Sequence, residues 1–263
     1  MFRVTEFDQD GERLETWQLP SGEDVPFDVT CAPDGRIIYY AAGQFPSEPG
    51  IVRWHVPVYW ISRDPRSRGL IRDGVPGPER VLEPGDGGYW ERPWSRQLVL
   101  GGTNQGMWIG TSDDYMLEFV GWDGTVLDTL AWSGADRTVT QAHFDQLRNE
   151  LTQDDDEEEK ARFLREGWPD YERVLPSTVP AYSQLLVLDD GTLWVAQWDG
   201  VWWLPRLPEH PGKRWDVFDP AGERVRQVTI PTNMRLLDAG EDWVLVVVRD
   251  TLGVQTLAVY EFS

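Results

Sequence analysis

FDQDGER at Phe7–Arg13 and FDPAGER at Phe218–Arg224 are two copies of one pattern, and they lie near opposite ends of the chain. Each copy runs on to a proline, Pro20 or Pro231, at the same spacing. A looser third copy is FVGWDG at Phe119–Gly124. Glycine beside aspartate closes a β-hairpin, because glycine adopts a positive φ without a Cβ clash. The pattern therefore predicts a strand, a tight turn and a second strand at three places.

A second pattern is a turn that leads into an apolar strand. It occurs as DGRIIYYA at Asp34–Ala41, DGTLWVA at Asp190–Ala196, QGMWIG at Gln105–Gly110 and, more degenerate, GEDWVLVVV at Gly240–Val248. Runs that are apolar on both faces are typical of strands sandwiched between neighbouring sheets. The two patterns alternate along the chain, and such self-similarity indicates a repeat fold.

These repeats predict an all-β fold, a β-propeller with four-stranded antiparallel blades in a single domain over residues 1–263. A propeller blade takes about 40–50 residues, so the longer intervals between repeats must hold insertions. We expect a long loop over 63–93 and a helical, acidic insertion over 138–175. About four repeat units are visible, at the low end for closed propellers. Residues 2–7 are expected to complete the sheet formed by the last segment, 235–263.

The insertion over 138–175 combines helical periodicity with an acidic run. Phe144, Leu147 and Leu151 recur at the spacing of one helix face. The acidic run Asp154–Glu159 follows, and apolar residues return at Phe163. We expect two short helices packed on the β body. The alternative is a disordered acidic linker between domains.

The charge balance limits the partners of the chain. Its 45 acidic and 24 basic residues give a formal net charge of −21. Phosphate backbones and anionic membrane surfaces repel such a chain, so we expect no nucleic-acid partner. No stretch approaches the roughly 18 apolar residues of a membrane span. A single cysteine, Cys31, excludes an internal disulfide, and its strand-like neighbours predict a buried, inert thiol.

The C-terminal third resembles a known family. The resemblance is carried by YSQLLVLDDGTLWV at Tyr182–Val195, WDVFDPAG at Trp215–Gly222 and DTLGV at Asp250–Val254. The family is the uncharacterised bacterial six-bladed β-propeller proteins, similar in style to NHL-repeat and TolB-like propellers. It implies a propeller fold and no particular reaction. Its members are usually longer, with further N-terminal blades and often a leader.

The start of the chain bears on localisation. Met1–Phe7 alternates like a strand and does not read as a signal peptide. Taken as complete, the chain is expected in the cytoplasm. As a fragment of a longer exported protein, it is expected in the periplasm or at the cell surface.

Residues that could carry catalysis are few. His55, His143 and His210 show no metal-ligand spacing, and no nucleophile motif is present. We therefore expect no cofactor, with calcium as the weak alternative. Gluconolactonase-like propellers hold a divalent metal with Glu, Asn and Asp side chains, and a resemblance to them leaves Asn104 and Asp189 as available ligands. Both residues fit turns better, so the triad is not assigned.

Tryptophan is the most suggestive residue type, with 15 in the chain. The suggestive cluster comprises Trp194, Trp198, Trp202, Trp203 and Trp215. Trp194 is expected in the core, whereas the Trp198–Trp203 segment lies beside a hairpin, where a ring could be exposed for binding. Packing between blades is the alternative. The candidate binding residues are Trp198, Trp202, Trp203, Asn104 and Tyr182.

Three functions remain open at this point. The leading hypothesis is a non-enzymatic propeller that binds a partner protein, a small molecule or a carbohydrate through its variable loops. The alternative is a metal-dependent hydrolase or lactonase that uses the central channel. A third reading is a fragment without independent function. The oligomeric state is left undetermined by the sequence.

Overall fold

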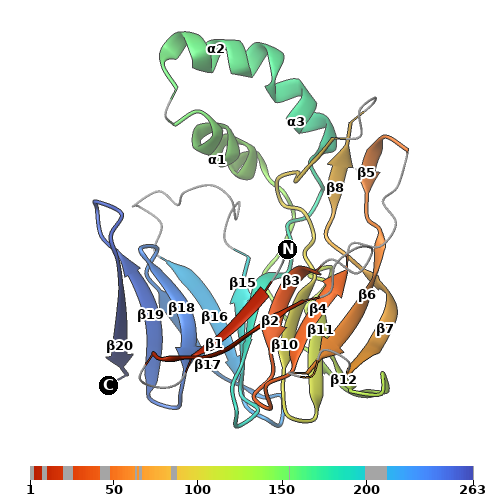
Figure 1. The fold of residues 1–263 in the computed structure, drawn as a ribbon. Helices are drawn as coiled ribbons and strands as arrows, with labels where there is room; N and C mark the ends of the chain where they lie inside the picture. The colour runs from red at the N-terminus through yellow and green to blue at the C-terminus, as the bar shows by residue number, and fades with distance from the viewer. Residues whose placement is uncertain are drawn as a thin grey trace. The chain divides into compact units, whose positions relative to one another are not determined.

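The structure is a computed structural model that describes residues 3–7, 11–19, 26–41, 48–62, 64, 67–83, 88–153, 155–198 and 212–262. These residues form twenty strands and three helices (Figure 1). The chain divides into two compact units. Unit 1 comprises residues 1–89, 97–111 and 116–132, and unit 2 comprises residues 90–96, 112–115 and 133–263. We expected one domain over 1–263, and this stays a prediction.

Unit 1 contains two four-stranded antiparallel sheets. The first has the order β3 (Pro26–Cys31), β4 (Ile37–Ala41), β6 (His55–Ile61) and β7 (Arg68–Pro76). The second has the order β10 (Val99–Gly102), β11 (Gly106–Gly110), β12 (Met116–Gly121) and β13 (Val126–Ala131). Both sheets contribute to one apolar core, in which Ile38, Met107 and Val120 are fully buried. The apolar runs read from the sequence are thus the central strands.

Shorter strands complete unit 1. One sheet has the order β5 (Gly50–Val52), β8 (Arg80–Leu82) and β9 (Tyr89–Trp90). Another is the hairpin of β1 (Arg3–Phe7) and β2 (Arg13–Gln18). The β1 strand therefore pairs with β2, whereas we expected residues 2–7 to complete the C-terminal sheet.

Unit 2 contains a third four-stranded antiparallel sheet and a three-stranded one. The first has the order β14 (Tyr182–Val187), β15 (Leu193–Gln197), β16 (Lys213–Phe218) and β17 (Arg224–Ile230). The second has the order β18 (Met234–Ala239), β19 (Trp243–Arg249) and β20 (Gln255–Glu261). Trp194, Trp215 and Val246 belong to the buried core that the two sheets share. The core role predicted for Trp194 is confirmed, and Trp215 lies in the same core.

Five hairpin turns share one geometry, and they explain the sequence repeats. In each, a glycine with φ between 80° and 89° donates its N–H to the carbonyl three residues earlier. These glycines are Gly35, Gly124, Gly191, Gly222 and Gly253. The DG pattern at Gly35 and Gly191 joins the first two strands of a sheet, and the pattern at Gly124 and Gly222 joins the last two. The repeat read from the sequence is therefore the repeat of the sheets.

The predicted fold class is confirmed: the chain is all-β, of the propeller class, with repeated four-stranded antiparallel blades. Residues 63–93 differ from the expected long loop, because they include β7, β8 and β9. The glycines that suggested a loop are accommodated in β7. A Cβ on Gly69 would lie 2.6 Å from Nε1 of Trp60, so only glycine lets this ring pack against the strand.

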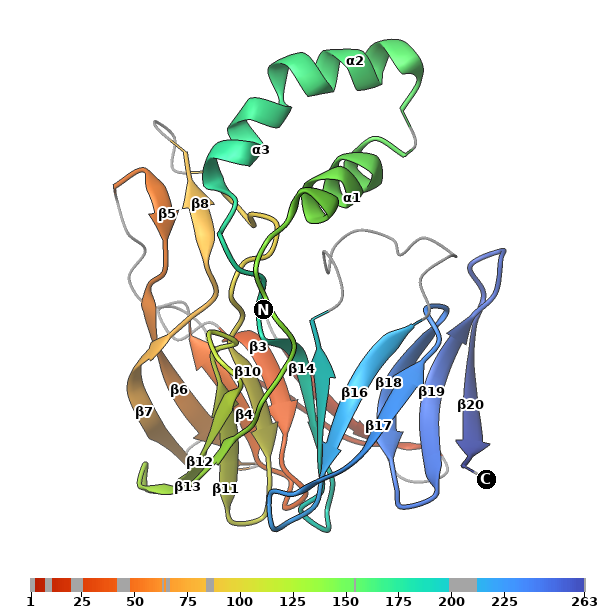
Figure 2. The ribbon, with the colours of Figure 1, turned by 180° about the vertical axis from the view of Figure 1, so that it is seen from behind.

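The helical insertion forms three helices where we expected two. These are α1 (Gln141–Leu151), α2 (Glu157–Glu166) and α3 (Trp168–Val174). Two views of unit 2 show them beyond one end of its sheets (Figures 1 and 2). The acidic run begins α2, where the Asp156 carboxylate accepts hydrogen bonds from the N–H groups of Glu158 and Glu159 at 2.9 Å. Asp154 lies outside the described residues.

The prediction for the Cys31 thiol is wrong. We expected a buried thiol, but Cys31 is exposed at the end of β3. Its immediate neighbour Ala32 is buried, so strand alternation turns the cysteine side chain away from the core.

Candidate functional site

An aromatic cluster underlies the helical insertion of unit 2. Trp94, Leu147, Trp168 and Val179 are buried in it, and Phe144 packs against them. The Phe144 ring meets both Trp94 and Trp168 edge to face, at centroid distances of 5.9 and 6.3 Å. Such pairs favour this geometry because the positive edge of one ring faces the negative face of the other. The helices are therefore fixed by aromatic packing on their inner side.

The start of α1 brings a histidine to this cluster. The Thr140 N–H donates to Nδ1 of His143 at 3.0 Å, which occupies one ring nitrogen with a helix cap. The His143 ring also meets Trp94 edge to face, with centroids 5.9 Å apart. Because Nδ1 accepts this hydrogen bond, the neutral ring carries its proton on Nε2. The cap thus sets both the position and the tautomer of His143.

Trp198 lies directly after β15, at the border of the aromatic cluster. Its ring meets Trp94 edge to face at 6.4 Å and lies 6.4 Å from the His143 ring. Trp198 is half-buried, whereas Trp94 is buried. The buried Trp94 ring therefore fixes the orientation of the Trp198 ring, part of which is exposed. The packing of Trp198 against Trp94 is observed, and its role in binding stays a prediction.

Residues 90–96 form a strap, a segment that hydrogen-bonds to the end of the helical insertion. Trp94 has a φ of 59°, in the left-handed region that a bulky residue rarely adopts. The buried Arg92 donates from Nη1 to the carbonyl of Val174 at 2.7 Å, and Nη2 of Arg96 donates to Oγ1 of Thr178 at 2.5 Å. Backbone strain of this kind persists only where the surrounding contacts hold it. Here the arginines supply those contacts on both sides of Trp94.

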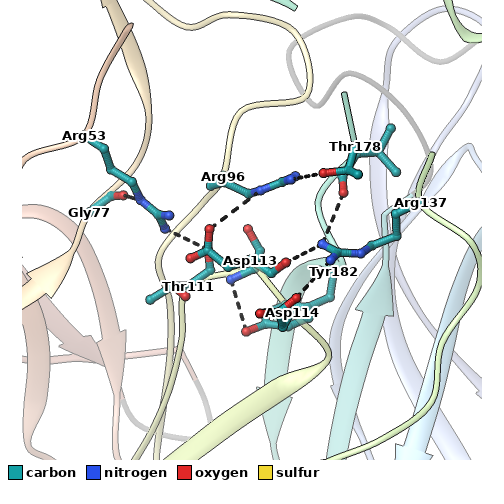
Figure 3. Close-up of polar contacts among 11 residues, drawn as sticks. Arg53, Gly77, Arg96, Thr111, Asp113, Asp114, Arg137, Thr178 and Tyr182 are labelled. Atoms are coloured by element: carbon teal, nitrogen blue, oxygen red, sulfur yellow. Dashed lines mark hydrogen bonds and ion pairs between the residues drawn. The ribbon is translucent and has the colours of Figure 1, made fainter. Parts of the chain in front are cut away.

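A second strained residue, Ser112, lies in the loop 112–115. Its φ is 53° and it is fully buried. The Ser112 N–H donates to the Tyr182 hydroxyl at 3.2 Å, and the Ala181 N–H donates to the Ser112 carbonyl at 3.0 Å. Ala181 and Tyr182, at the start of β14, therefore hold Ser112 in its left-handed conformation, and Figure 3 shows Tyr182 beside Asp113 and Asp114 of this loop.

Arg137, in the segment before α1, hydrogen-bonds to the same loop. Its guanidinium donates to the Asp113 carbonyl and, at 3.0 Å, to the Asp114 carboxylate (Figure 3). It also lies over the Tyr115 ring, 5.6 Å from the centroid. Burial raises the pKa of the Tyr115 hydroxyl, and the Arg137 charge opposes that increase. Loop, strap and insertion are thus connected by arginine side chains.

The other predicted binding residues have different surroundings. Tyr182 is buried and supports Ser112, so its hydroxyl acts within the framework. Asn104 lies in an exposed turn of unit 1, where its carbonyl accepts from Nε1 of Trp122 at 3.2 Å. Trp202 and Trp203 lie outside the described residues. Their roles in binding stay predictions.

Trp94, Ser112 and Arg137 were not identified from the sequence. No sequence pattern predicts a tryptophan or a serine in the left-handed region, where glycine is the usual residue. The signal that was available is the composition of the strap, ERPWSR at Glu91–Arg96, which places two arginines around an aromatic residue.

The described residues hold no group of three or more His, Cys, Asp or Glu side chains arranged to bind a metal ion. Asp189 is exposed in the turn after β14. His55 is exposed on β6, and His210 lies outside the described residues. In the part of the chain that the structure covers, no helix has the length and apolar character to cross a membrane.

Fold and site together define a class: an all-β chain with propeller-type blades that carries a helical insertion over an aromatic cluster. No protein-family model matches the chain, and no curated protein matches it. Among solved structures, it is similar to a calcium-binding protein, regucalcin, of Agrobacterium tumefaciens, at 10% identity and a TM-score of 0.38 over 86% of this chain. It is also similar to a gluconolactonase of Xanthomonas campestris, at 14% identity and a TM-score of 0.39 over 92% of this chain.

A third similar structure is AztD of Citrobacter koseri, at 9% identity, with a TM-score of 0.28 over 99% of this chain and 55% of that one. The chain spans 54% of the regucalcin chain and 60% of the gluconolactonase chain. These likenesses are too distant to carry an argument about activity.

Proposed function

We propose that this chain is a non-enzymatic binding module that holds a ring-shaped ligand with polar edges against Trp198. The observation that carries the proposal is the half-buried Trp198 ring, held edge to face by the buried Trp94. Ligand sites are typically apolar and aromatic surfaces with a few fixed polar groups. A carbohydrate is the simplest class that presents an apolar ring face together with polar edges.

A polar network at the end of β15, directly before Trp198, supports this ligand class. The preceding residue, Gln197, accepts a hydrogen bond on its carbonyl from the Ser183 hydroxyl at 3.5 Å. Nζ of Lys213 donates to the same Ser183 hydroxyl at 3.2 Å. The His143 ring, whose centroid lies 6.4 Å from that of Trp198, is the polar side chain in contact with this aromatic surface. A ligand that stacks on Trp198 would find hydrogen-bond partners at its edges.

The ligand class is tested by screening the intact protein on an array of immobilised oligosaccharides. The proposal expects binding to at least one sugar class and its loss in Trp198→Ala. Trp108→Ala is the control, because Trp108 is also half-buried but lies in unit 1, paired with Phe119 at 5.1 Å. Binding only to a partner protein, through residues 138–175, would favour a protein-binding module over a carbohydrate-binding one.

The second candidate is a metal-dependent hydrolase or lactonase, with calcium as its cofactor. Calcium binding and gluconolactonase activity are named for two of the similar structures, and they come to this chain as a proposal only. Metal analysis after dialysis, combined with hydrolysis of glucono-1,5-lactone in added calcium, separates the two candidates. Retained stoichiometric metal with lactone turnover would favour the enzyme.

The number of blades in the complete ring is also a proposal. The resemblance to six-bladed, NHL-like propellers leads us to propose that these blades belong to such a ring. An experimental structure of the purified protein tests it, and a closed ring of another size would contradict it. The cellular compartment likewise remains a prediction.

A further inference from the structure

Within the described part of unit 2, the strand β20 has a neighbour on only one of its two sides. The sheet order is β18-β19-β20, so β19 is the only described neighbour of β20, whereas the sheet β14–β17 has four strands. Both views show β20 at the outer edge of its sheet (Figures 1 and 2). An open edge presents a row of backbone donors and acceptors to any strand that can pair with it.

This edge lacks the features that normally prevent strand pairing. Proteins protect edge strands with proline, lysine, a bulge or a very short strand. The β20 strand is seven residues long, QTLAVYE, and contains neither proline nor lysine. Its pairing with β19 runs from Gln255 to Glu261 without a register shift. Among the described residues of unit 2, it is a regular strand whose outer edge no other strand pairs with.

The groups that point away from β19 can be assigned. The Phe262 N–H donates to the Asp242 carbonyl at 2.7 Å. Hydrogen bonding alternates along an antiparallel pair, so the residues in phase with Phe262 bond to β19. The odd-numbered residues Gln255, Leu257, Val259 and Glu261 therefore direct their N–H and C=O groups to the open edge.

The two central side chains at this edge are apolar and exposed. Leu257 is 65% exposed and Val259 is 63% exposed. Glu261 is the single charged residue of β20, although the chain as a whole carries a net charge of −21. A strand with an apolar centre and a single charge, in so acidic a protein, suits a partner strand of the same kind.

We propose that two copies of this chain join edge to edge, with β20 pairing antiparallel to β20 about a twofold axis at Ala258. This register places Leu257 opposite Val259 of the second copy, and Gln255 opposite Glu261. Each of these positions has outward backbone groups, so every pair exchanges hydrogen bonds. No like charges face each other, and apolar residues meet apolar residues. The surface is therefore complementary to itself, as a twofold interface requires.

Sedimentation velocity of the intact protein, from about 2 to about 200 µM, tests this interface by mass action. We expect a monomer–dimer equilibrium that strengthens when NaCl rises from about 0.05 to about 0.5 M, because salt screens the repulsion between two acidic molecules. Val259→Lys should weaken association by about tenfold or more, since it replaces a central cross-strand pair with charge. Leu257→Pro removes an outward N–H and should weaken association in the same way.

The matched control is Leu252→Lys, which adds the same charge to the β19–β20 turn, outside the strand. Leu252 is 87% exposed, so the substitution leaves the fold intact. The control should dimerise like the natural protein. A natural protein that stays monomeric at every concentration would overturn the proposal, as would a folded Val259→Lys variant that dimerises normally. Circular dichroism establishes that each variant is folded.

Discussion

The rings of Trp198 and Trp94 lie edge to face, with centroids 6.4 Å apart and planes at 88°. Trp94 is buried, so truncating it should remove both core packing and the support of Trp198. We expect Trp94→Ala to lower the free energy of unfolding by about 3–5 kcal/mol, the usual cost of a large buried ring. Urea unfolding measures this loss.

The comparison variant is Trp198→Ala. Since Trp198 is half-buried, its truncation should cost markedly less than that of Trp94. Equal losses for the two variants would show that Trp198 is an ordinary core residue, and the binding proposal would lose its basis.

Ser112 should tolerate glycine better than a larger residue. Its φ of 53° suits glycine, and the left-handed region costs other residues about 1–3 kcal/mol. We expect Ser112→Gly to stay within about 1 kcal/mol of the natural protein, because relief of strain offsets the lost hydroxyl. Ser112→Val should lose about 2 kcal/mol or more, because β-branched residues strongly disfavour this conformation. Thermal unfolding compares them, and similar melting temperatures would contradict the assignment.

Arg137 and Asp114 form an ion pair, but replacing each of them should lower the stability by a different amount. The Asp114 side chain is 79% exposed, whereas that of Arg137 is 18% exposed and also bonds the Asp113 carbonyl. Asp114→Ala should therefore cost at most about 1 kcal/mol, as exposed pairs do. Arg137→Ala should cost about 2–3 kcal/mol, because it leaves backbone carbonyls without their charged donor. Equal losses in chemical denaturation would show that the ion pair, and not the backbone contacts, carries the stability.

Asp136 should make stability depend on pH in the acid range. The Thr138 N–H and hydroxyl donate to its carboxylate at 2.9 and 2.8 Å, and these bonds lower its pKa below 3.8. A lowered pKa in the folded state stabilises the protein above pH 3.8, and the benefit disappears as the pH falls through the folded value. The stability difference between the natural protein and Asp136→Asn should thus shrink from pH 7 to about pH 2. A difference that stays constant with pH would contradict this account.

The sequence predicted the β architecture because its cues are local. The turn glycines, such as Gly35 and Gly191, require a positive φ, and the apolar runs after them are central strands. The C-terminal strands were likewise visible as apolar runs between turns. Such features depend on neighbours in the chain, so a single sequence shows them.

The site depends on contacts between distant segments, and it was only partly visible. Trp198 was identified, but its partners Trp94 and His143 come from separate segments that no local pattern connects. The strand β7 was missed because Gly69 and Gly74 resemble loop residues. Glycine is needed at Gly69 by the Trp60 ring, a tertiary contact that the sequence does not display.

Binding of a sugar against the Trp198 ring is measured by titration calorimetry of the intact protein with the best-bound sugar of the array. We expect saturable binding that weakens by about tenfold or more in Trp198→Ala, the loss expected when one stacking ring is removed. Trp108→Ala should bind like the natural protein. Unchanged affinity in a folded Trp198→Ala variant would contradict the account.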